Sequence, residues 1–576
     1  MSLTLPPLPH PAPAPPRRRW ARGLLAAAAV LWLLLALHAL GSGVASEPPQ
    51  SAWAWLGTAL LHAPYLLILA LLGFGLLERV GFLLRPGGHA PGRLPATLPK
   101  VCVQLPMFNE DAVAARVIGA AAALDWPAER LRIQVLDDST DAATRQHVRA
   151  VCARLQRQHG VAIDWLHRED RSGYKAGALE AGRRRSDAEF IAIFDADFVP
   201  PPDYLRRALP LFFDAHGQPH RDVGLVQAQW GHLNDDESAL TAAQALWVDD
   251  HHSLQMSWRT RHLGFVNFTG TAGVWRAAAI ESAGGWRSAS LVEDCELSIR
   301  VLFAGWRTRF VRELAVPAEL PQTLAAYRLQ QKRWTQGWAQ LQRLHLLPLL
   351  TRHRTSAARK AFLTYLMCIS WQWPLWATWI LTLPILIAHG LWVGAGSTAA
   401  AVAVYLLPAL GFSVLAGAAA TAHTRHGQGS RDGFWRRFAR LGPYLVVHTG
   451  MLPHHVCAFV EGLLGPLHAE FERTPKTASV TAPMPLDAGT PGALRQAAAA
   501  PPPRRPVRRW AYTAFEAVFV LVQLVWMAFF IGHGVPLAAL GAAWLAGCVI
   551  TLRLAPGWVR LQRRLGAARA AQGVVR

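Results

Sequence analysis

Three acidic motifs have residue types and spacing that could carry chemistry. Asp195-Ala196-Asp197 follows an apolar run, and its two carboxylates can hold one hard cation while leaving coordination positions for diphosphate oxygens. Asp137-Asp138 follows another apolar run, where a carboxylate can accept hydrogen bonds from a base or ribose. Glu293-Asp294 opens a helical pattern, where acidic residues commonly interact with the helix dipole. Each motif by itself is also typical of a solvated turn or a helix cap.

Basic, aromatic and amide side chains complete the set of candidates. Lys175 is one of five lysines in the chain and lies between Gly173 and Gly177, where it could neutralise phosphate or be an ordinary surface charge. Gln330, Arg333 and Trp334 share one helix face because their spacing is i, i+3 and i+4. Arginine can clamp a diphosphate and tryptophan can stack on a sugar, although both also anchor helices at membrane surfaces. The sequence has no GxGxxG and no GxxxxGKS/T, which excludes dinucleotide and P-loop sites of those types.

Short apolar runs predict the elements that position these residues. Three of them have the length and composition of buried parallel strands: Val101–Leu105, Ile133–Leu136 and Phe190–Phe194. We therefore expect a soluble α/β domain over residues 99–345, with its chemistry at the carboxyl ends of these strands. Asp138 or Ser139 is the expected cap of a helix that begins near Asp141.

The composition indicates a membrane protein. Of the 576 residues, 52% are hydrophobic and 16% are charged, which excludes a disordered chain. Six apolar stretches are long enough to span a bilayer: Trp20–Leu40, Trp53–Phe82, Ala361–His389, Leu391–Ala420, Ala511–Ile531 and Val535–Thr551. Prolines and histidines interrupt Leu441–Gly465, so we expect an interfacial helix there. His62 and Glu516 are the ionisable residues well inside the clear spans.

Lysine and arginine are segregated by this topology. Three short connections contain neither residue type: Ser42–Ala52, the residues around Gly390, and Gly532–Pro536. The basic segments all fall on the opposite side: Arg17–Arg19, Arg425–Arg440, Arg504–Arg509 and the tail from Arg560. The net charge of +21 is thus explained by topology, and we expect no nucleic-acid partner. The six cysteines have neither a disulfide pattern nor zinc-ligand spacing.

Taken together, the motifs resemble a known family. The order Asp137-Asp138, Asp195-x-Asp197, Glu293-Asp294, Gln330-x-x-Arg333-Trp334 is similar to the D, DxD, ED, QxxRW signature of family 2 glycosyltransferases of the cellulose synthase type. Longer strings look most like the cellulose-synthase-like A proteins, which are glucomannan or mannan synthase-like, and their bacterial relatives: Gln104-Leu-Pro-Met-Phe-Asn-Glu110 and Gly173-Tyr-Lys-Ala-Gly-Ala-Leu179. Val292 replaces the Thr of TED, and Phe268-Thr269-Gly270 replaces Phe-Asn-Gly, so the sugar stays open.

A segment after the interfacial helix extends the resemblance. Phe471-Glu-Arg-Thr474-Pro-Lys476 resembles the FxVTxK gating loop of cellulose synthases, with Arg473 in place of valine. The predicted organisation is a Pro/Arg-rich cytosolic N-terminus (1–19), two transmembrane helices (20–85), a family 2 catalytic domain (99–345), two transmembrane helices (360–420), an interfacial helix (441–465), a gating-like loop and linker (466–509), two transmembrane helices (510–553) and a basic cytosolic tail (554–576).

The resemblance implies a GT-A-type, Rossmann-like cytosolic domain that binds a nucleotide sugar and is inserted in an α-helical transmembrane domain. It implies an inverting transfer with Asp294 as general base and with Mg²⁺ (or Mn²⁺) held by Asp195 and Asp197. It implies nucleotide-sugar binding by nine residues: Asp137, Asp138, Lys175, Asp195, Gln330, Arg333, Trp334, Thr474 and Lys476.

The expected function is transfer of a hexose from UDP-glucose or GDP-mannose to a growing β-linked polysaccharide. The alternative is a non-processive lipid glycosyltransferase similar to ceramide glucosyltransferase; an inactive binding domain of a transporter is a third interpretation, which the intact acidic motifs oppose. Expected partners are the nucleotide-sugar donor, a polysaccharide or lipid-linked acceptor and membrane lipids, with any export partner undefined. The expected location is the bacterial inner (plasma) membrane, as a multi-pass protein with a cytosolic catalytic domain.

Overall fold

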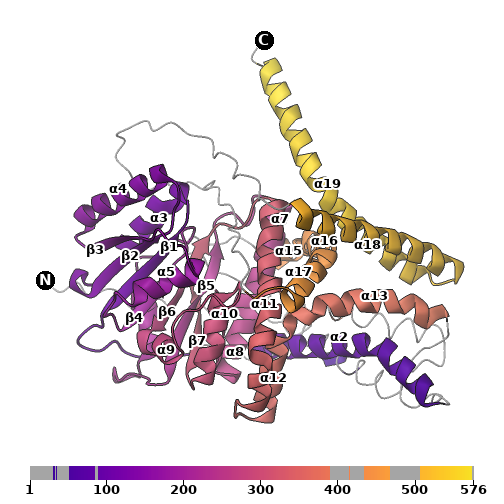
Figure 1. The fold of residues 1–576 in the computed structure, drawn as a ribbon, viewed down its shortest axis with the longest axis horizontal. Coiled ribbons are helices and arrows are strands. Elements are labelled where there is room, and N and C mark those ends of the chain that lie inside the picture. The colour runs from indigo at the N-terminus through magenta and orange to yellow at the C-terminus, as the bar shows by residue number, and fades with distance from the viewer. Residues whose placement is uncertain are drawn as a thin grey trace.

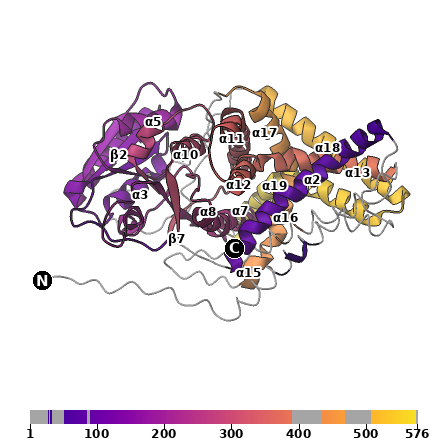
Figure 2. The same ribbon diagram turned by 90° about the horizontal axis from the view of Figure 1, so that it is seen from below.

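The computed structural model describes residues 27, 30–32, 34, 51–84, 89–388, 411, 414, 434–467 and 506–573. An α/β domain occupies one side, and three long helices, α2 (Ala52–Leu84), α13 (Gln372–Ala388) and α18 (Pro506–Gly532), extend from the other side (Figures 1 and 2).

The α/β domain is built on a seven-stranded sheet in the order β3-β2-β1-β4-β6-β5-β7. Its strands are β1 (Val101–Met107), β2 (Leu131–Asp137), β3 (Ala162–His167), β4 (Phe190–Ile193), β5 (Val223–His232), β6 (Gly273–Arg276) and β7 (Arg307–Ala318). Strands β1, β2 and β4 are parallel, as predicted, and β3, which was not predicted, is parallel to them, whereas β6 runs antiparallel to both of its neighbours. The chain places β2 and β4 on opposite sides of β1, and in such sheets ligands bind in the crevice at the carboxyl ends near this reversal.

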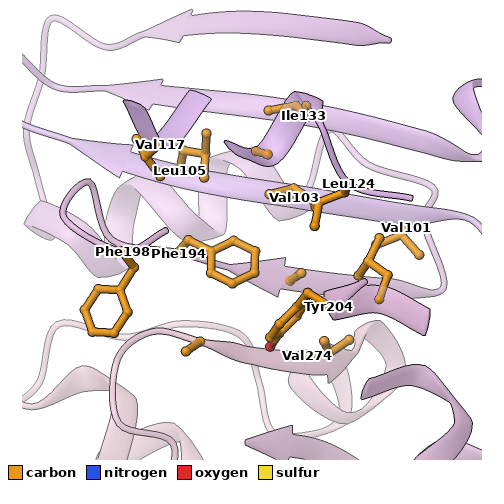
Figure 3. Close-up of a cluster of buried hydrophobic side chains, with 14 of the residues drawn as sticks. Val101, Val103, Leu105, Val117, Leu124, Ile133, Phe194, Phe198, Tyr204 and Val274 are labelled. Atoms are coloured by element: carbon orange, nitrogen blue, oxygen red, sulfur yellow. The ribbon is translucent and has the colours of Figure 1, made fainter. Parts of the chain in front are cut away.

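Both faces of the sheet are covered, which explains the continuous apolar runs. Successive side chains of a strand point to opposite faces. In β1, Val101, Val103 and Leu105 belong to one core cluster (Figure 3), whereas Cys102 belongs to the other. The first cluster includes residues of α3 (Asp111–Ala122), α4 (Ala142–His159) and α6 (Tyr204–Ala208), and the second includes residues of α5 (Tyr174–Arg183), α9 (Ala277–Ser282) and α10 (Glu293–Phe303).

Further helices connect the sheet to the long apolar helices. They are α7 (Ala239–Asp249), a π-helix (Asp250–Met256), α8 (Ser257–His262), α11 (Leu324–Thr351), α12 (Ala357–Met367), α15 (Phe434–Ala439), α16 (Leu441–Gly450), α17 (Leu452–Leu464) and α19 (Pro536–Gly573). Among the described residues, three helical segments are long and apolar enough to cross a membrane: Ala59–Leu84, Trp510–Gly532 and Ala538–Ala555. They correspond to three of the six predicted spans.

Two predicted helices are divided in the structure. A short 3₁₀ turn over Ile369–Trp371 separates α12 from α13, so the stretch predicted as one span is two helices. The predicted interfacial helix is likewise divided into α16 and α17, with Pro453 in the first turn of α17, where its missing N–H is tolerated. The predicted first span, the span over Leu391–Ala420 and the gating-like loop lie outside the described residues, apart from a few isolated positions.

Buried ion pairs join α2 to the α/β domain. Glu78 Oε1 accepts a hydrogen bond from Arg259 Nε of α8 at 2.6 Å, and Arg79 Nε donates to Asp250 Oδ1 at 2.8 Å. All four side chains are almost inaccessible to solvent. The end of the first described span is thus fixed to the helices that follow β5.

Candidate active site

The carboxyl ends of β1, β2 and β4 border a cavity of about 290 Å³ that is closed on its other side by α10 and α11. Eight residues of the predicted acidic, basic and QxxRW motifs line it: Asp138, Lys175, Asp195, Asp197, Asp294, Gln330, Arg333 and Trp334. Glu293 lines it as well. Thr474 and Lys476 lie outside the described residues, so the structure does not place them.

Asp195 and Asp197 follow β4 directly, in the loop that enters the cavity. The backbone N–H of Asp195 donates to Thr271 Oγ1 at 2.9 Å, and Asp195 Oδ1 accepts from Lys175 Nζ at 2.6 Å. In the described part of the chain no three His, Cys, Asp or Glu side chains form a cage that could enclose a metal ion. Mg²⁺ and Mn²⁺ commonly take one or two protein carboxylates and complete their coordination with phosphate and water, so this pair fits such an ion.

Lys175 lies at the first turn of α5, and its ammonium connects the acidic loop to a neighbouring one. Its Nζ also donates to Gly270 O at 2.8 Å. Burial acts to lower the pKa of Lys175, but the nearby charges of Asp195, Glu293 and Asp294 outweigh burial, so the pKa is raised. The side chain is therefore a fixed cation inside the cavity, which contradicts its interpretation as a solvated surface charge.

Glu293 and Asp294 form the first turn of α10, which has no side-chain N-cap. Asp294 Oδ1 accepts from the Cys295 N–H at 2.7 Å, and its other oxygen is so near Gly270 that a Cβ there would lie 3.0 Å from Oδ2. Gly270 has φ +83°, which also disfavours any side chain. Burial raises the pKa of both carboxyls, and for Glu293 the adjacent Asp294 charge raises it further. A group of this kind is better suited to accept a proton than an exposed carboxylate.

Helix α11 presents Gln330, Arg333 and Trp334 to the cavity from the side opposite the strands. Burial lowers the pKa of Arg333, while the carboxylates of Glu293, Asp195, Asp294 and Asp197 act to raise it. The guanidinium therefore lies near the carboxylates of both the Asp195-x-Asp197 and the Glu293-Asp294 motifs. Motifs that are almost 200 residues apart in the sequence thus line the same cavity.

Trp334 is part of an aromatic cluster. Its indole lies nearly parallel to that of Trp247, with ring centroids 5.6 Å apart, and its centroid is 6.4 Å from that of Trp230. Near-parallel aromatic rings beside a cavity offer flat apolar area of the type on which sugar rings stack.

The two acids after β2 differ in their surroundings. Asp137 is fully buried, and its oxygens accept hydrogen bonds from the Ser139 N–H at 2.9 Å and from Trp165 Nε1 at 3.0 Å. Both oxygens thus hold the loop, and the nucleoside contact predicted for Asp137 stays a prediction. Asp138 lines the cavity and pairs with Arg168, whose Nε is 2.8 Å from Asp138 Oδ1. The helix cap is Asp141, which accepts from the Thr144 N–H, so the prediction that Asp138 or Ser139 caps α4 is wrong.

Several site residues were not identified by sequence reasoning. Arg168 fixes Asp138, Thr271 fixes the backbone of Asp195, and Trp230 and Trp247 flank Trp334. Gly270 and Thr271 belong to a Gly-Thr-Ala-Gly string whose small residues signal close backbone approach. Arg168 and the two tryptophans give no comparable local signal.

A second cavity, of about 250 Å³, adjoins the first on the membrane side of Trp334. Asp294, Val292 and Trp334 line both cavities. The second one extends between α2 and α13, where Ile68 and Trp376 contribute to its wall. Its other lining residues include aromatic and polar groups: Trp338, Trp373, Arg79, Asp250, Gln255 and Gln331.

Comparison with known proteins agrees with this geometry. Residues 99–337 match the family described as glycosyltransferase like family 2. Over 273 residues, covering 47% of this chain and 50% of the relative, the chain is 42% identical to glucomannan 4-beta-mannosyltransferase 2 of Arabidopsis thaliana. It is 41% identical over 273 residues to glucomannan 4-beta-mannosyltransferase 1 of Oryza sativa subsp. japonica, covering 47% and 51% of the two chains. The chain thus spans about half the length of the curated relatives it matches.

Among solved structures, the chain is similar to a mannosyltransferase from Pyrobaculum calidifontis in complex with GDP-Man and Mn²⁺, with a TM-score of 0.48 and 20% identity over 70% of this chain and 99% of that one. The resemblance indicated by the sequence motifs is confirmed: residues 99–337 match the family described as glycosyltransferase like family 2 and are similar to the glucomannan 4-beta-mannosyltransferases.

Proposed function

We propose that this protein is an inverting membrane glycosyltransferase that transfers mannose from GDP-mannose to a growing β-1,4-linked polysaccharide. The observation that carries the proposal is the convergence of Asp195, Lys175, Asp294 and Arg333 on one cavity that also contains Trp334. The matching plant relatives favour mannose over the glucose that the sequence left open, because they are named as glucomannan 4-beta-mannosyltransferases, some of them as probable ones.

The reaction is a single displacement at the anomeric carbon. The acceptor hydroxyl oxygen forms the new bond to that carbon, its proton passes to Asp294, and the bond from carbon to the diphosphate oxygen breaks. The leaving group is the nucleoside diphosphate, whose developing charge Lys175 and Arg333 stabilise. Because attack and departure occur on opposite faces, the configuration at the carbon inverts.

Asp195 and Asp197 are proposed to hold Mg²⁺ or Mn²⁺, which supplies positive charge for the diphosphate oxygens. Lys175 keeps Asp195 oriented through their 2.6 Å contact. Asp138, fixed by Arg168, is proposed to contact the nucleoside, and Asp137 to hold the loop that carries Asp138. Gln330 contributes to the same wall, and Thr474 and Lys476 are proposed to close over bound nucleotide.

The second cavity supports a carbohydrate acceptor. This cavity begins at Asp294 and Trp334 and leads between α2 and α13, so the acceptor polysaccharide could occupy it with its growing end at Asp294. Its wall combines tryptophans with Arg79, Asp250 and Gln255, which suit the apolar faces and hydroxyl groups of sugars. Arg79 and Asp250 pair with each other and Gln255 donates to Glu78, but a lipid tail beside them would exclude water from their remaining donors and acceptors. This lining therefore favours the polysaccharide over the lipid acceptor.

The membrane part is proposed to be multi-pass, with the glycosyltransferase domain and the basic loops on one side. Three described segments have the length and composition of spans, and the remaining predicted spans belong to the proposal. The matching relatives are plant proteins and give no support to the bacterial inner membrane expected from the sequence, so the proposal names no organelle or organism.

The test is to incubate purified membranes with labelled GDP-mannose and UDP-glucose in turn and to digest the product with linkage-specific glycanases. We expect a polymer from GDP-mannose that β-1,4-mannanase degrades, and about 10² to 10⁴ times slower product formation by Asp294→Asn membranes. One sugar per lipid would establish the lipid glycosyltransferase instead, and nucleotide release with neither donor would refute the enzyme.

A further inference from the structure

Helix α11 has a second charged face in addition to the one that lines the cavity. Arg328, Lys332 and Thr335 follow one another at i, i+4 and i+7 and therefore lie along one side of the helix. The contacts of these three residues all involve α17 or α18 and not the strands. The helix that carries Arg333 and Trp334 thus lies between α10 of the α/β domain and the helices α17 and α18, as Figure 2 shows.

Glu516 of α18 is the acceptor at the centre of this second face. It lies within the candidate span Trp510–Gly532, and its side chain is 2% exposed. Its Oε2 accepts from Arg328 Nη2 at 3.4 Å and also from Arg553 Nε of α19. One buried carboxylate therefore faces two arginines from two different helices, a costly arrangement that membrane proteins keep for functional sites.

Further contacts fix α11 along the same side. Lys332 Nζ is 3.1 Å from Glu461 Oε2 of α17, and Thr335 Oγ1 is 2.8 Å from His455 Nδ1. His454 Nε2 donates to the backbone carbonyl of Arg328 at 3.0 Å. The two helices approach so closely that a Cβ at Gly462 would lie 2.3 Å from the carbonyl oxygen of Gln336. These contacts prevent α11 from rotating or sliding. Glu516 is the charged residue by which α18 takes part in them.

We propose that Glu516 is a positioning residue for sugar transfer, which acts through Arg328 to hold α11 and thus Arg333 and Trp334 at the active site. Arg328 is five residues before Arg333 on the same continuous helix, so a shift at one is transmitted to the other. Without the carboxylate, Arg328 and Arg553, whose side chains are 18% and 35% exposed, lose their counter-charge and turn towards water. The inference rests on the proposed function, because it concerns the geometry of that reaction.

The experiment uses the full chain in purified membranes or detergent. Glu516→Gln should lower kcat by about 10- to 100-fold, the scale of a misplacement of about 1 Å in an active site, while affinity for GDP is retained. Rates are expressed per GDP-binding site, so that loss of folded protein alone does not change them. Gln523→Met is the matched control: Gln523 lies two turns further along α18, is 1% exposed, and its side-chain nitrogen has no hydrogen-bond partner among the described residues.

A double-mutant cycle identifies the partner. Arg328→Met should reproduce the loss, and the combination with Glu516→Gln should lose no more than either single variant, because both remove the same contact. If Arg328→Met has wild-type kcat while Glu516→Gln and Arg553→Met do not, Glu516 serves only to hold α19 and the proposal is wrong. It is also wrong if Glu516→Gln keeps wild-type kcat per GDP-binding site. An inactive wild-type protein would instead refute the proposed function.

Discussion

Gly337 is a point of very close approach between α11 and the segment that leads into Glu293 and Asp294. It lies one turn after Arg333 and Trp334, and a Cβ built on it would be 2.6 Å and 2.7 Å from the two Cγ atoms of Val292. Gly337→Ala therefore forces Trp334, the proposed acceptor platform, and the acidic motif apart without altering any group that takes part in the reaction. We expect a specific loss of turnover.

The size of the effect follows from these distances. Carbon atoms in favourable contact are at least about 3.5 Å apart, so the two segments must separate by about 0.9 Å. A displacement of about 1 Å at an active site can lower the rate by about 10²-fold. Overpacking destabilises by about 1–3 kcal/mol, whereas Ala in place of Gly stabilises a helix interior by about 1 kcal/mol. The net loss of stability should therefore be small, about 0–2 kcal/mol.

The assay measures kcat and KM for GDP-mannose together with thermal unfolding in detergent. Gly547→Ala in the interior of α19 is the control, because a Cβ there meets no atom within 4 Å among the described residues. Gly337→Ala combined with Val292→Ala should recover most of the activity, since the second change removes both Cγ atoms and leaves a Cβ contact at 3.1 Å. If Gly337→Ala is as active as Gly547→Ala, or if Val292→Ala restores nothing, the contact does not set the geometry of the site.

Three further outcomes follow from the site. Asp195→Ala and Asp197→Ala should abolish turnover because alanine cannot coordinate a metal ion; activity that persists in both variants and resists EDTA would contradict this. Asp294→Asn should lower kcat by about 10² to 10⁴ while donor binding, measured with labelled nucleotide, is retained; loss of binding with unchanged chemistry would make Asp294 a structural residue. Trp334→Ala should impair transfer to a carbohydrate acceptor far more than donor binding, and an unchanged distribution of product lengths would refute its role as acceptor platform.

The parts of the fold that follow from local pattern were predictable. Strands β1, β2 and β4 are buried on both faces, so their sequences are continuous apolar runs, and the acids that follow them lie at the predicted edge. The antiparallel strand β6 has only four residues, too few for a periodic signal. The cap of α4 was assigned wrongly because Asp138, Ser139 and Asp141 are all good caps, and only the pairing of Asp138 with Arg168 decides among them.

The parts that depend on distant partners were not predictable. Trp334 was identified from its spacing to Arg333, but its neighbours Trp230 and Trp247 come from β5 and α7. The division of residues 361–389 into two helices reflects the packing of α12 and α13 against different neighbours. Glu516 was noted as an unusual acid inside a span, yet its partner Arg328 lies 188 residues earlier, beyond any local pattern.

The ion pairs at the end of α2 have a consequence for the order in which the protein is made. Glu78 and Arg79 leave the ribosome well before their partners, since Asp250 follows Arg79 by 171 residues and Arg259 follows Glu78 by 181. At typical rates of synthesis this interval is roughly 10 to 30 s. During that time the C-terminal part of α2 carries two charges without their final partners, so it must stay at the water-facing end of the insertion machinery or be shielded by it. Helix α2 therefore reaches its final position only after the α/β domain has been synthesised past α8.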